Sequence, residues 1–264
     1  ALDDPLDPIT SYWWRVTPRN ACGDGTATAA NSFTTRDTPA LLLVDDDDNS
    51  PDVRGTYEAT LNALGQDFDL VDTANTDNEP TASELAPYTV VVWFTGDEFG
   101  GAAGPGSAGE SALETWLGTG NRCLLISSQD YFWDRGLTPF METRLGISAA
   151  DSDEGQDTVT GNGSVFAGLG PYVLNYPFSD FSDDLTQGPG GEVAFMGATA
   201  PAAMQRTIDD SLGVYFAFPF VALPDEASRT TVLQAFLDAC GGSGMIFANG
   251  FESGHMGDWV VGSE

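Results

Sequence analysis

Four consecutive aspartates follow directly on an apolar run at positions 41–48, which read LLLVDDDD. A short apolar run without interruption is typical of a strand that is buried on both faces, as the strands of parallel sheets are. Ligands of such sheets gather at the carboxyl ends of the strands. The sequence therefore predicts that one edge of an α/β sheet carries Asp45, Asp46, Asp47 and Asp48.

The residues after this motif alternate between helix and strand signals. We expect a helix that Ser50 caps, Pro51 opens and Gly65 ends, with an apolar face made of Val53, Tyr57, Leu61 and Leu64. Further strands are expected at 68–71, 89–94 and 123–127, and further helices at 83–86, 107–117 and 139–145. This alternation predicts a doubly wound, mainly parallel α/β sheet.

After Gly146 the sequence becomes rich in glycine and polar residues. Short strand patterns recur at 192–196, 203–208 and 214–218, before a final helix at 227–239. We interpret this section as an antiparallel extension of the sheet.

The charge balance is strongly acidic, with 40 acidic residues against nine arginines, no lysine, and a formal net charge of -31 over 264 residues. Binding to nucleic acid or to anionic lipid needs a basic face, so the composition argues against both partners. No apolar run approaches the roughly 18 residues of a membrane helix, which argues against membrane insertion. Cations are the natural partners, although an acidic surface also keeps a secreted protein soluble without any specific role.

The positions of the cysteines favour one pairing. Cys123 opens a predicted strand and Cys240 closes the last predicted helix. In a parallel α/β sheet, strands begin and crossover helices end at the same edge, so these two cysteines are placed to form a disulfide. Cys22 would then be unpaired or paired with a cysteine outside this sequence.

The first part of the chain departs from the α/β pattern. Residues 12–17, YWWRVT, alternate like a strand, and 31–35, NSFTT, read as a second strand after the turn-rich NACGDGTATAA. This segment, 11–35, resembles the final hairpin of a fibronectin type III domain in secreted bacterial proteins, so we assign 1–37 as a partial domain of that kind. A two-stranded hairpin is marginal alone. We expect it to pack on another domain or molecule through Tyr12, Trp13, Trp14 and Phe33.

The segment 38–242 is similar to the class I glutamine amidotransferase-like, flavodoxin-type domains of secreted bacterial peptidases and exoproteins. The resemblance is carried by LLLVDDDDNSPDVRGTYEATLNALG, LAPYTVVVWFTGDEF, LLISSQDYFWD and FAFPFVALPDEASRTTVLQAFLDACG. It implies a non-catalytic accessory domain in a secreted, extracellular bacterial protein. The tail, 243–264, contains IFANGFESGHMGDW, which resembles the FADGFESG-type ending of secreted proteobacterial proteins, and its candidate docking residues are Phe247, Phe251 and Trp259.

A catalytic set is missing from the expected positions. An amidotransferase needs a cysteine at the turn after a strand, with a histidine as its base. That turn reads Ser127, Ser128, Gln129, Asp130, and the only histidine, His255, lies in the tail. No glycine-rich loop follows Val44, so neither a nucleotide nor a flavin is expected. The sequence therefore predicts a protein that is not an enzyme.

Oxygen-bearing side chains at the carboxyl edge suggest calcium as the candidate ion, because calcium takes six to eight oxygen ligands. The expected ligands are Asp45, Asp46, Asp47, Asp48, Asp97, Glu98 and Asp130. A second, weaker candidate is the loop that holds Asp151, Asp153 and Asp157. Alternatively, the four aspartates cap the following helix or are simply solvated.

A group of aromatic residues is the other candidate feature of this edge. It would line a cleft for carbohydrate or peptide, or else belong to the core, and it comprises Trp93, Phe94, Trp116, Tyr131, Phe132 and Trp133.

Three functions remain open from the sequence. The first is a structural module, processed from a longer precursor, that docks by strand addition on copies of itself or on other domains of that precursor. The second is an accessory domain of a secreted peptidase that binds substrate. The third is an unrecognised hydrolase. We favour the first, because the chain's two ends carry unpartnered hairpin and tail segments.

Overall fold

The computed structural model describes residues 6–21, 23–74, 78–101 and 103–241. The chain divides into two compact units, Ala1–Pro39 and Ala40–Glu264. Cys22 and several predicted residues of the tail lie outside the described residues, namely Phe247, Phe251, His255 and Trp259.

The first unit contains an antiparallel hairpin of β1 (Ser11–Trp14) and β4 (Asn31–Thr34), followed outward by the short pair β2 (Arg19–Asn20) and β3 (Gly23–Asp24). The first predicted strand was too long, since regular pairing ends at Trp14. Beyond that point the two segments of the hairpin are still joined at Val16 and Thr28. The Val16 N–H donates to the Thr28 hydroxyl, and the Thr28 N–H donates to the Val16 carbonyl.

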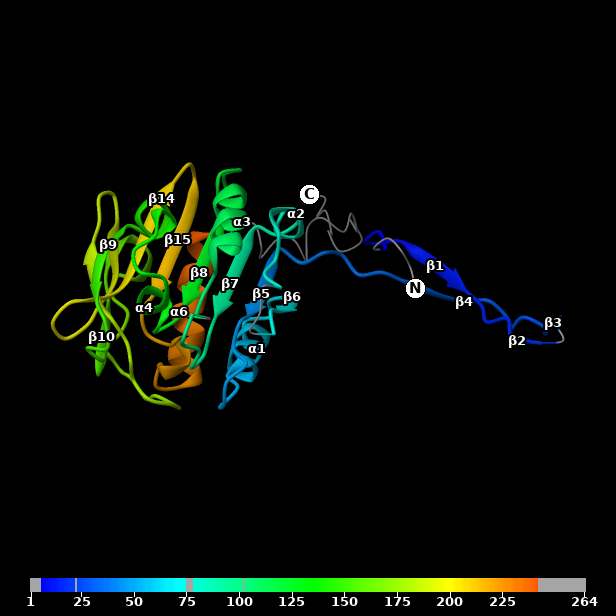
Figure 1. Ribbon diagram of the computed structural model, residues 1–264, viewed down its shortest axis with the longest axis horizontal. Helices are drawn as coiled ribbons and strands as arrows, with labels where there is room; N and C mark the ends of the chain where they lie inside the picture. Colours follow the sequence, from blue (N-terminus) through cyan, green and yellow to red (C-terminus); the bar gives the residue numbers. More distant parts are fainter. Residues whose placement is uncertain (1–5, 22, 75–77, 102, 242–264) are drawn as a thin grey trace, which may run out of the picture. The chain divides into compact units, whose positions relative to one another are not determined.

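The second unit is built around a nine-stranded sheet (Figure 1), in the order β11-β10-β13-β14-β15-β8-β7-β5-β6. All neighbours from β6 to β15 are parallel, and these strands are β6 (Phe68–Asp72), β5 (Leu41–Asp45), β7 (Val90–Phe94), β8 (Cys123–Ser127) and β15 (Ser211–Phe216). The remaining neighbours are antiparallel, and these strands are β14 (Pro201–Ile208), β13 (Glu192–Met196), β10 (Thr158–Gly161) and β11 (Tyr172–Val173). A separate pair joins β9 (Ile147–Asp151) to β12 (Asp184–Gln187). The predicted α/β class with an antiparallel extension is confirmed, but the strand expected at 214–218 in that extension is β15, which is parallel to β8 and extends the parallel part of the sheet.

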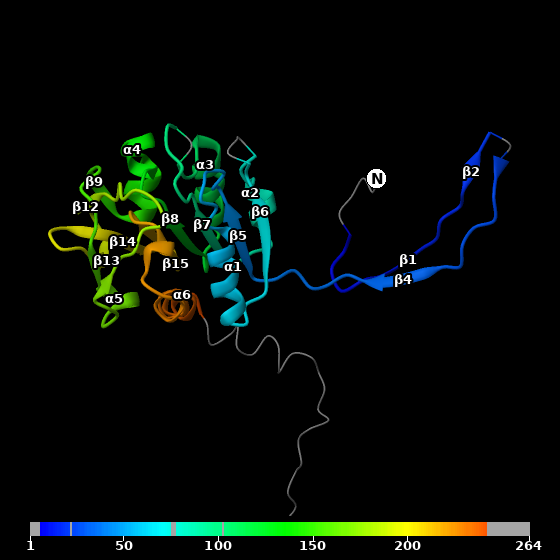
Figure 2. The same ribbon diagram turned by 90° about the horizontal axis from the view of Figure 1, so that it is seen from below.

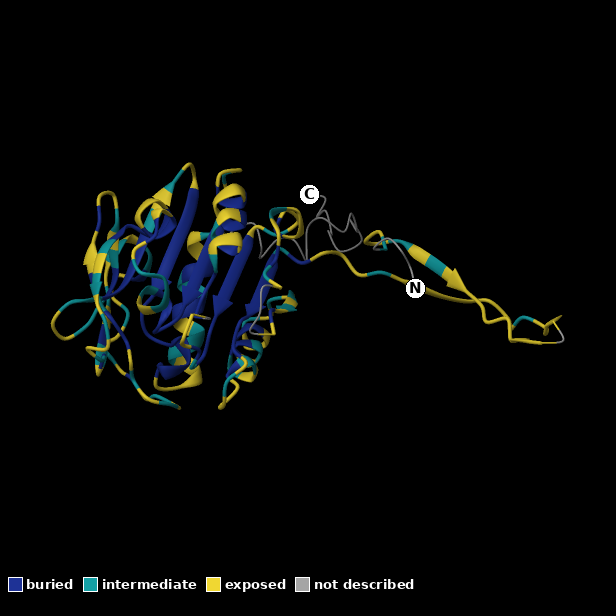
Figure 3. Ribbon diagram, viewed as in Figure 1, coloured by how far each residue is buried: buried dark blue, intermediate teal, exposed yellow. Residues whose placement is uncertain are grey.

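Helices cover both faces of this sheet (Figure 2) because the central strands are apolar on both sides. Leu41 and Leu43 point to the face covered by α1 (Arg54–Ala63), α5 (Gly163–Phe166) and α6 (Glu226–Ala239). Leu42 and Val44 point to the opposite face, which packs against α2 (Ala82–Leu85), α3 (Ser107–Leu117) and the π-helical turn η1 (Met141–Leu145). The central strands are accordingly buried along their whole length (Figure 3).

The start of α1 differs from the prediction. The helix begins at Arg54 rather than at Pro51, and Val53 rather than Ser50 is its N-cap residue. Two carboxylates satisfy the free N–H groups at this end, because Val53 donates to Asp47 and Arg54 donates to Asp52, both across 2.9 Å. Carboxylates are favourable at this position since they also compensate the positive end of the helix dipole.

A further helix, α4 (Tyr131–Arg135), was not predicted, and the predicted helix at 139–145 is shorter than expected. Five residues are too few for an apolar period to be recognised. The helix ends at Gly136, whose φ of 63° lies in the left-handed region. The chain then re-enters a helical turn at η1, where Met141 donates its N–H to the Thr138 hydroxyl across 3.2 Å.

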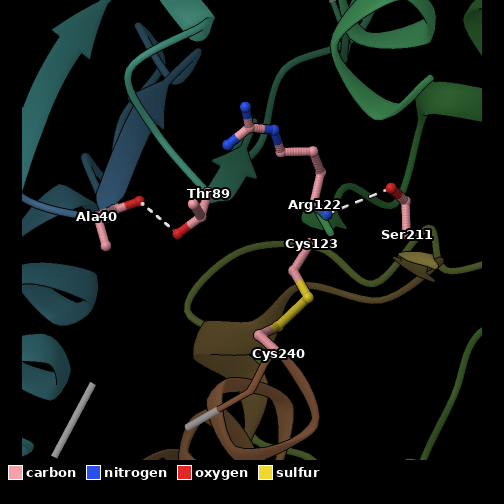
Figure 4. Close-up of a disulfide and its surroundings, with 6 residues drawn as sticks. All are labelled: Ala40, Thr89, Arg122, Cys123, Ser211 and Cys240. Carbon is pink, nitrogen blue, oxygen red and sulfur yellow. Dashed lines mark hydrogen bonds between the residues drawn. A yellow bond between two sulfur atoms is a disulfide. The ribbon is translucent and has the colours of Figure 1, made fainter. Parts of the chain in front are cut away.

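A disulfide joins Cys123, the first residue of β8, to Cys240, the C-cap of α6 (Figure 4). Their Cα atoms lie 5.8 Å apart across a sequence separation of 117 residues. The bond ties the end of the last helix to the centre of the sheet. Among the described residues, the longest apolar helix falls short of what crossing a membrane requires.

Candidate functional site at the carboxyl edge of the sheet

The carboxyl ends of β5, β7, β8 and β15 meet at one edge of the sheet. Backbone hydrogen bonds continue beyond the strands, from Asp46 to Phe94 at 2.9 Å, from Thr95 to Ser127 at 3.3 Å and from Ser128 to Phe216 at 3.1 Å. The turns that follow the strands are therefore held side by side. This continuity brings the predicted acidic and polar residues to a common edge.

Asp45 is engaged in an ion pair. Its carboxylate accepts a hydrogen bond from Arg54 in α1, and Arg54 also donates to Asp72 at the end of β6. Burial raises the pKa of Asp45, and the hydrogen bond from Arg54 opposes that rise. Arg54 thus links the ends of two strands to the helix between them.

Asp46 is held on the opposite face of the turn. One carboxylate oxygen accepts from the Thr73 hydroxyl and the other accepts from the indole N–H of Trp93 at 2.9 Å. Burial raises the pKa of Asp46 to about 7, although both hydrogen bonds favour the ionised form. Both of its oxygens are occupied by protein donors.

Asp47 serves the start of α1. It accepts from the backbone N–H groups of Val53 at 2.9 Å and Asn49 at 3.3 Å, and burial raises its pKa to about 7. Gly96 lies directly against it, since a Cβ atom at position 96 would fall 2.2 Å from the Asp47 carboxyl carbon. Asp48 is exposed, and its N–H donates to the buried carboxylate of Glu98 at 3.0 Å.

These contacts bear directly on the expected calcium rim. Three of the four aspartates already accept hydrogen bonds from the protein. Within the described ranges, no group of three or more His, Cys, Asp or Glu side chains is placed to hold one metal ion. Calcium binding at this edge stays a prediction of the sequence.

Gln129, which is fully buried, connects three loops of this edge. Its amide nitrogen donates to Asp97 after β7 at 3.4 Å and to the carbonyl of Ser179 at 3.3 Å. Its amide oxygen accepts from the N–H of Phe181 at 3.2 Å. The turn after β8 therefore positions both the loop after β7 and the loop before β12.

Asp130 and Asp183 form the most perturbed part of the edge. Burial raises the pKa of Asp130 to about 7, with the charges of Asp134, Asp153 and Asp97 acting in the same direction. Burial raises the pKa of Asp183 to about 8, with the charges of Asp130 and Asp153 acting in the same direction. Asp183 accepts from the Asp153 N–H at 3.3 Å through one oxygen, while its other oxygen has no hydrogen-bond partner.

The second predicted calcium loop is divided by the fold. Asp151 lies in β9, paired with Asp184, and the carbonyl of Asp157 accepts from Leu174 at 2.9 Å. Asp153 alone approaches Asp130 and Asp183. The structure thus places one of the three predicted ligands at the carboxyl edge, and it adds Asp183.

Of the two alternatives for the aromatic group, a cleft or the core, most of its members follow the second. The hydrophobic core contains Trp93, Phe94, Trp116 and Tyr131, all of them buried. Trp133 is 51% exposed. Two further aromatic side chains, which did not belong to the predicted group, are also exposed, Phe99 to 63% and Phe181 to 44%. The loop that follows Phe99 lies next to α4, which contains Trp133, because Asp134 of α4 accepts from the N–H groups of Gly100 and Ala103, both at 3.0 Å.

The serines at the turn after β8 are structural in their contacts. Ser127 accepts from the Phe220 N–H at 2.8 Å and donates to the Phe218 carbonyl at 3.4 Å. Ser128 is fully buried, and its hydroxyl has no hydrogen-bond partner. Since His255 is the only histidine of the sequence, no histidine stands near either serine within the described residues.

No family model matches this sequence, and comparison with curated proteins finds no match. Among solved structures, the chain is similar to the cytoplasmic protein STM3548 from Salmonella typhimurium, with 13% identity, a TM-score of 0.47, and coverage of 85% of this chain and 94% of that one. It is also similar to the exo-β-1,4-mannosidase Op5Man5 from Opitutaceae bacterium strain TAV5, at 14% identity and TM-score 0.47, over 80% of this chain and 36% of that one. A β-galactosidase from the Antarctic haloarchaeon Halorubrum lacusprofundi is similar at 14% identity and a TM-score of 0.48, over 78% of this chain and 31% of that one. Likenesses this distant carry no argument about activity.

Proposed function

We propose that this chain is a non-catalytic structural module of a secreted bacterial assembly, and that its N-terminal hairpin docks on a second copy of the chain. The observation that carries the proposal is the aromatic face of that hairpin. Tyr12 pairs directly with Phe33, and Trp14 follows on the same face because alternate strand residues share a side. Tyr12 and Phe33 stack with their ring centroids 5.8 Å apart.

Within residues 6–21 and 23–39 this face is left largely uncovered, since Trp14 and Phe33 are both exposed. Two paired strands are marginal on their own in water, and an aromatic sheet face is normally buried against another layer. Packing against a second molecule would supply that layer. The resemblance to a sandwich hairpin agrees with this interpretation.

Charge favours a copy of the same chain as the partner. Residues 1–39 contain three of the nine arginines but only five of the 40 acidic residues, so the net negative charge is concentrated in the α/β unit. Opposite potentials steer association and suppress wrong partners. With three arginines against five acidic residues, the hairpin unit is the part of a second copy that the acidic α/β unit repels least, and its arginines can pair with that acidic surface.

Three further features support the proposal. The five parallel strands follow the order β6-β5-β7-β8-β15, which corresponds to the flavodoxin-like, doubly wound order 2-1-3-4-5. The Cys123–Cys240 disulfide suits a secreted protein, because disulfides persist in oxidising compartments. Ser127 and Ser128 have neither a base nor free geometry for nucleophilic attack, which favours a role without catalysis.

Sedimentation velocity over a range of protein concentrations, with electron microscopy of the same samples, tests the proposal. Wild-type protein is expected to form oligomers, and Trp14→Ser combined with Phe33→Ser is expected to leave monomers. Val173→Ser serves as the control, because it removes another exposed apolar side chain from the α/β unit and should leave assembly unchanged. A compact monomer at every concentration would contradict the proposed function.

A further inference from the structure

We propose that the carboxyl edge of the sheet contains a binding site for a guanidinium group, and that its occupant is Arg15 from the hairpin of a second copy. The inference rests on the proposed function and names the surface on which the hairpin docks. We call this surface the acidic rim, and it comprises Asp97, Phe99, Asp130, Trp133, Phe181 and Asp183.

The acidic rim lacks a counter-charge. Asp130 and Asp183 are buried, and among the described residues neither forms an ion pair with an arginine. The charges that act most strongly on Asp130 come from Asp134, Asp153 and Asp97, which are all acidic. Buried carboxylates are costly unless they are paired, so these two acids hold protons in the free chain, and a cationic ligand would stabilise their ionised forms.

An unsatisfied acceptor lies within the same cluster. Asp183 is fully buried, and one of its carboxylate oxygens has no hydrogen-bond partner. The Phe181 N–H donates to Gln129, which precedes Asp130, so the loop that holds Asp183 lies against the turn that holds Asp130, and the charge of Asp130 acts on Asp183. An unpaired buried acceptor costs about 1–3 kcal/mol in general, and a donor from a ligand would relieve that cost.

Three exposed aromatic residues, which we call the aromatic border, lie on the segments that carry or adjoin the acids. Phe99 follows β7, Trp133 lies in α4, and Phe181 precedes β12, and all three are exposed. Gln129 and Asp134 fix these loops relative to one another through the hydrogen bonds already described. The aromatic border is therefore held by the same residues that position the acids.

This combination of groups matches a guanidinium better than a point charge. The guanidinium is planar, donates up to five N–H groups to carboxylates, and stacks on aromatic faces. A cation over an aromatic ring gains about 0.5–2 kcal/mol beyond its ion pairs. Carboxylates with exposed aromatic residues on the adjoining segments can offer a guanidinium both an ion pair and a stacking contact.

Arg15 is the arginine of this chain that is free to fill the site. It is exposed, it follows directly on Trp14, and it has no hydrogen bond, ion pair or ring contact with any residue that the structure describes. The other eight arginines all have a partner. These are Arg19, Arg36, Arg54, Arg122, Arg135, Arg144, Arg206 and Arg229.

A contact between the hairpin of one copy and the acidic rim of another joins two different surfaces. Such a heterologous contact leaves a free hairpin at one end of each dimer and a free acidic rim at the other. Unless the rotation between copies closes a ring, assembly continues into an open chain. The inference therefore predicts oligomers that grow with concentration rather than a closed dimer.

Complementation between two variants tests this arrangement. Arg15→Gln removes the guanidinium but keeps the aromatic hairpin, and Asp130→Asn combined with Asp183→Asn removes the charges of the acidic rim but keeps side-chain shape. Each variant alone is expected to need at least about tenfold more protein for half-maximal association. A mixture of Arg15→Gln with the rim variant is expected to form a one-to-one dimer that does not extend, because each supplies the surface that the other lacks.

Two controls isolate the contact. Asp210→Asn makes the same substitution in the turn between β14 and β15 and should leave assembly unchanged. Loss of negative charge in itself reduces repulsion between copies, so weaker association of the rim variant cannot come from bulk charge. Arg15→Lys retains the charge without the planar fork, and an intermediate loss is expected.

The outcomes separate this inference from the proposed function. Assembly that survives the rim substitutions but is lost in Trp14→Ser with Phe33→Ser would overturn the acidic rim as acceptor and leave hairpin docking intact. A wild-type chain that stays monomeric overturns both. Assembly that is abolished by a calcium chelator and restored by calcium chloride would make Asp130 a calcium ligand and would also overturn the arginine site.

Discussion

The indole N–H of Trp93 donates to Asp46 across 2.9 Å, in a place where both side chains are almost completely removed from solvent. The strand residue and the first turn residue of the neighbouring strand are thereby locked together. Asp45 and Asp47 are used in a similar way, by Arg54 and by the start of α1. The aspartates at the end of β5 therefore accept hydrogen bonds that join this edge of the sheet to its neighbouring strand and helix.

Asp46→Ala is expected to destabilise the protein by about 2–4 kcal/mol, because it leaves the buried Trp93 N–H and the Thr73 hydroxyl without their acceptor. Asp46→Asn retains one oxygen acceptor and should cost clearly less. Urea unfolding followed by tryptophan fluorescence measures both. Equal destabilisation by the two substitutions would show that the hydrogen bond to Trp93 contributes little.

Gly96→Ala is expected to lower the free energy of unfolding by more than the same substitution at another glycine with a positive φ. Gly96 has a φ of 55°, and an added Cβ would meet the Asp47 carboxylate. Gly65→Ala is the matched control, since Gly65 has a φ of 67° and open space around its Cβ position. Gly65→Ala should cost about 1 kcal/mol through backbone strain alone, and Gly96→Ala should exceed it in the same urea titration. Indistinguishable midpoints would contradict the close approach to Asp47.

Much of the α/β unit is readable from the sequence because its central strands are apolar on both faces. Residues 41–45 and 123–127 are short, mainly apolar runs. The structure places them as β5 and β8, on either side of β7 in the parallel part of the sheet. The helix at 107–117 was predicted with its observed bounds because it is long enough to show a period. Shorter elements, such as α4, carry no such signal.

The chemistry of the edge was less accessible to sequence reasoning. The sequence left the aspartates as calcium ligands, helix caps or solvated residues, because the donors that bind them come from distant residues such as Thr73 and Trp93. Asp183 stands 53 positions away from Asp130 in the sequence, and only the fold brings the two charges together. Phe99 and Phe181 likewise gain their meaning from exposure, which a sequence pattern does not reveal.

Removal of the disulfide is expected to lower stability without abolishing the fold. The bond closes a loop of 117 residues, and a loop of that size corresponds to roughly 4–5 kcal/mol in the chain-entropy description, with measured values of about 2–5 kcal/mol. Cys123→Ser with Cys240→Ser should therefore lower the urea midpoint. Cys22→Ser is the control for the third cysteine and should leave the midpoint unchanged. An unaltered midpoint in the double variant would indicate that the two cysteines are not joined in solution.

Stability is expected to increase when the pH falls from about 8 to about 5. Burial raises the pKa of Asp46, Asp47 and Asp130 to about 7 and that of Asp183 to about 8, all above the usual value of 3.8. Between these values the folded state holds protons that the unfolded state has released. The free energy of unfolding therefore falls as the pH rises toward the folded pKa values. The fall is about 1.4 kcal/mol per pH unit for each group that is still protonated in the folded state.

Urea midpoints measured at several pH values between 4.5 and 8.5 test this dependence, in high salt so that general repulsion among the acidic residues is screened. Asp183→Asn stays neutral at every pH, so the variant should show a shallower slope and should gain stability relative to wild type near pH 8.5. The oxygen of asparagine preserves the acceptor for the Asp153 N–H, which keeps the local structure. Stability that rises with pH over this range, or an unchanged slope in Asp183→Asn, would mean that Asp183 is ionised in its buried position and would contradict the raised pKa.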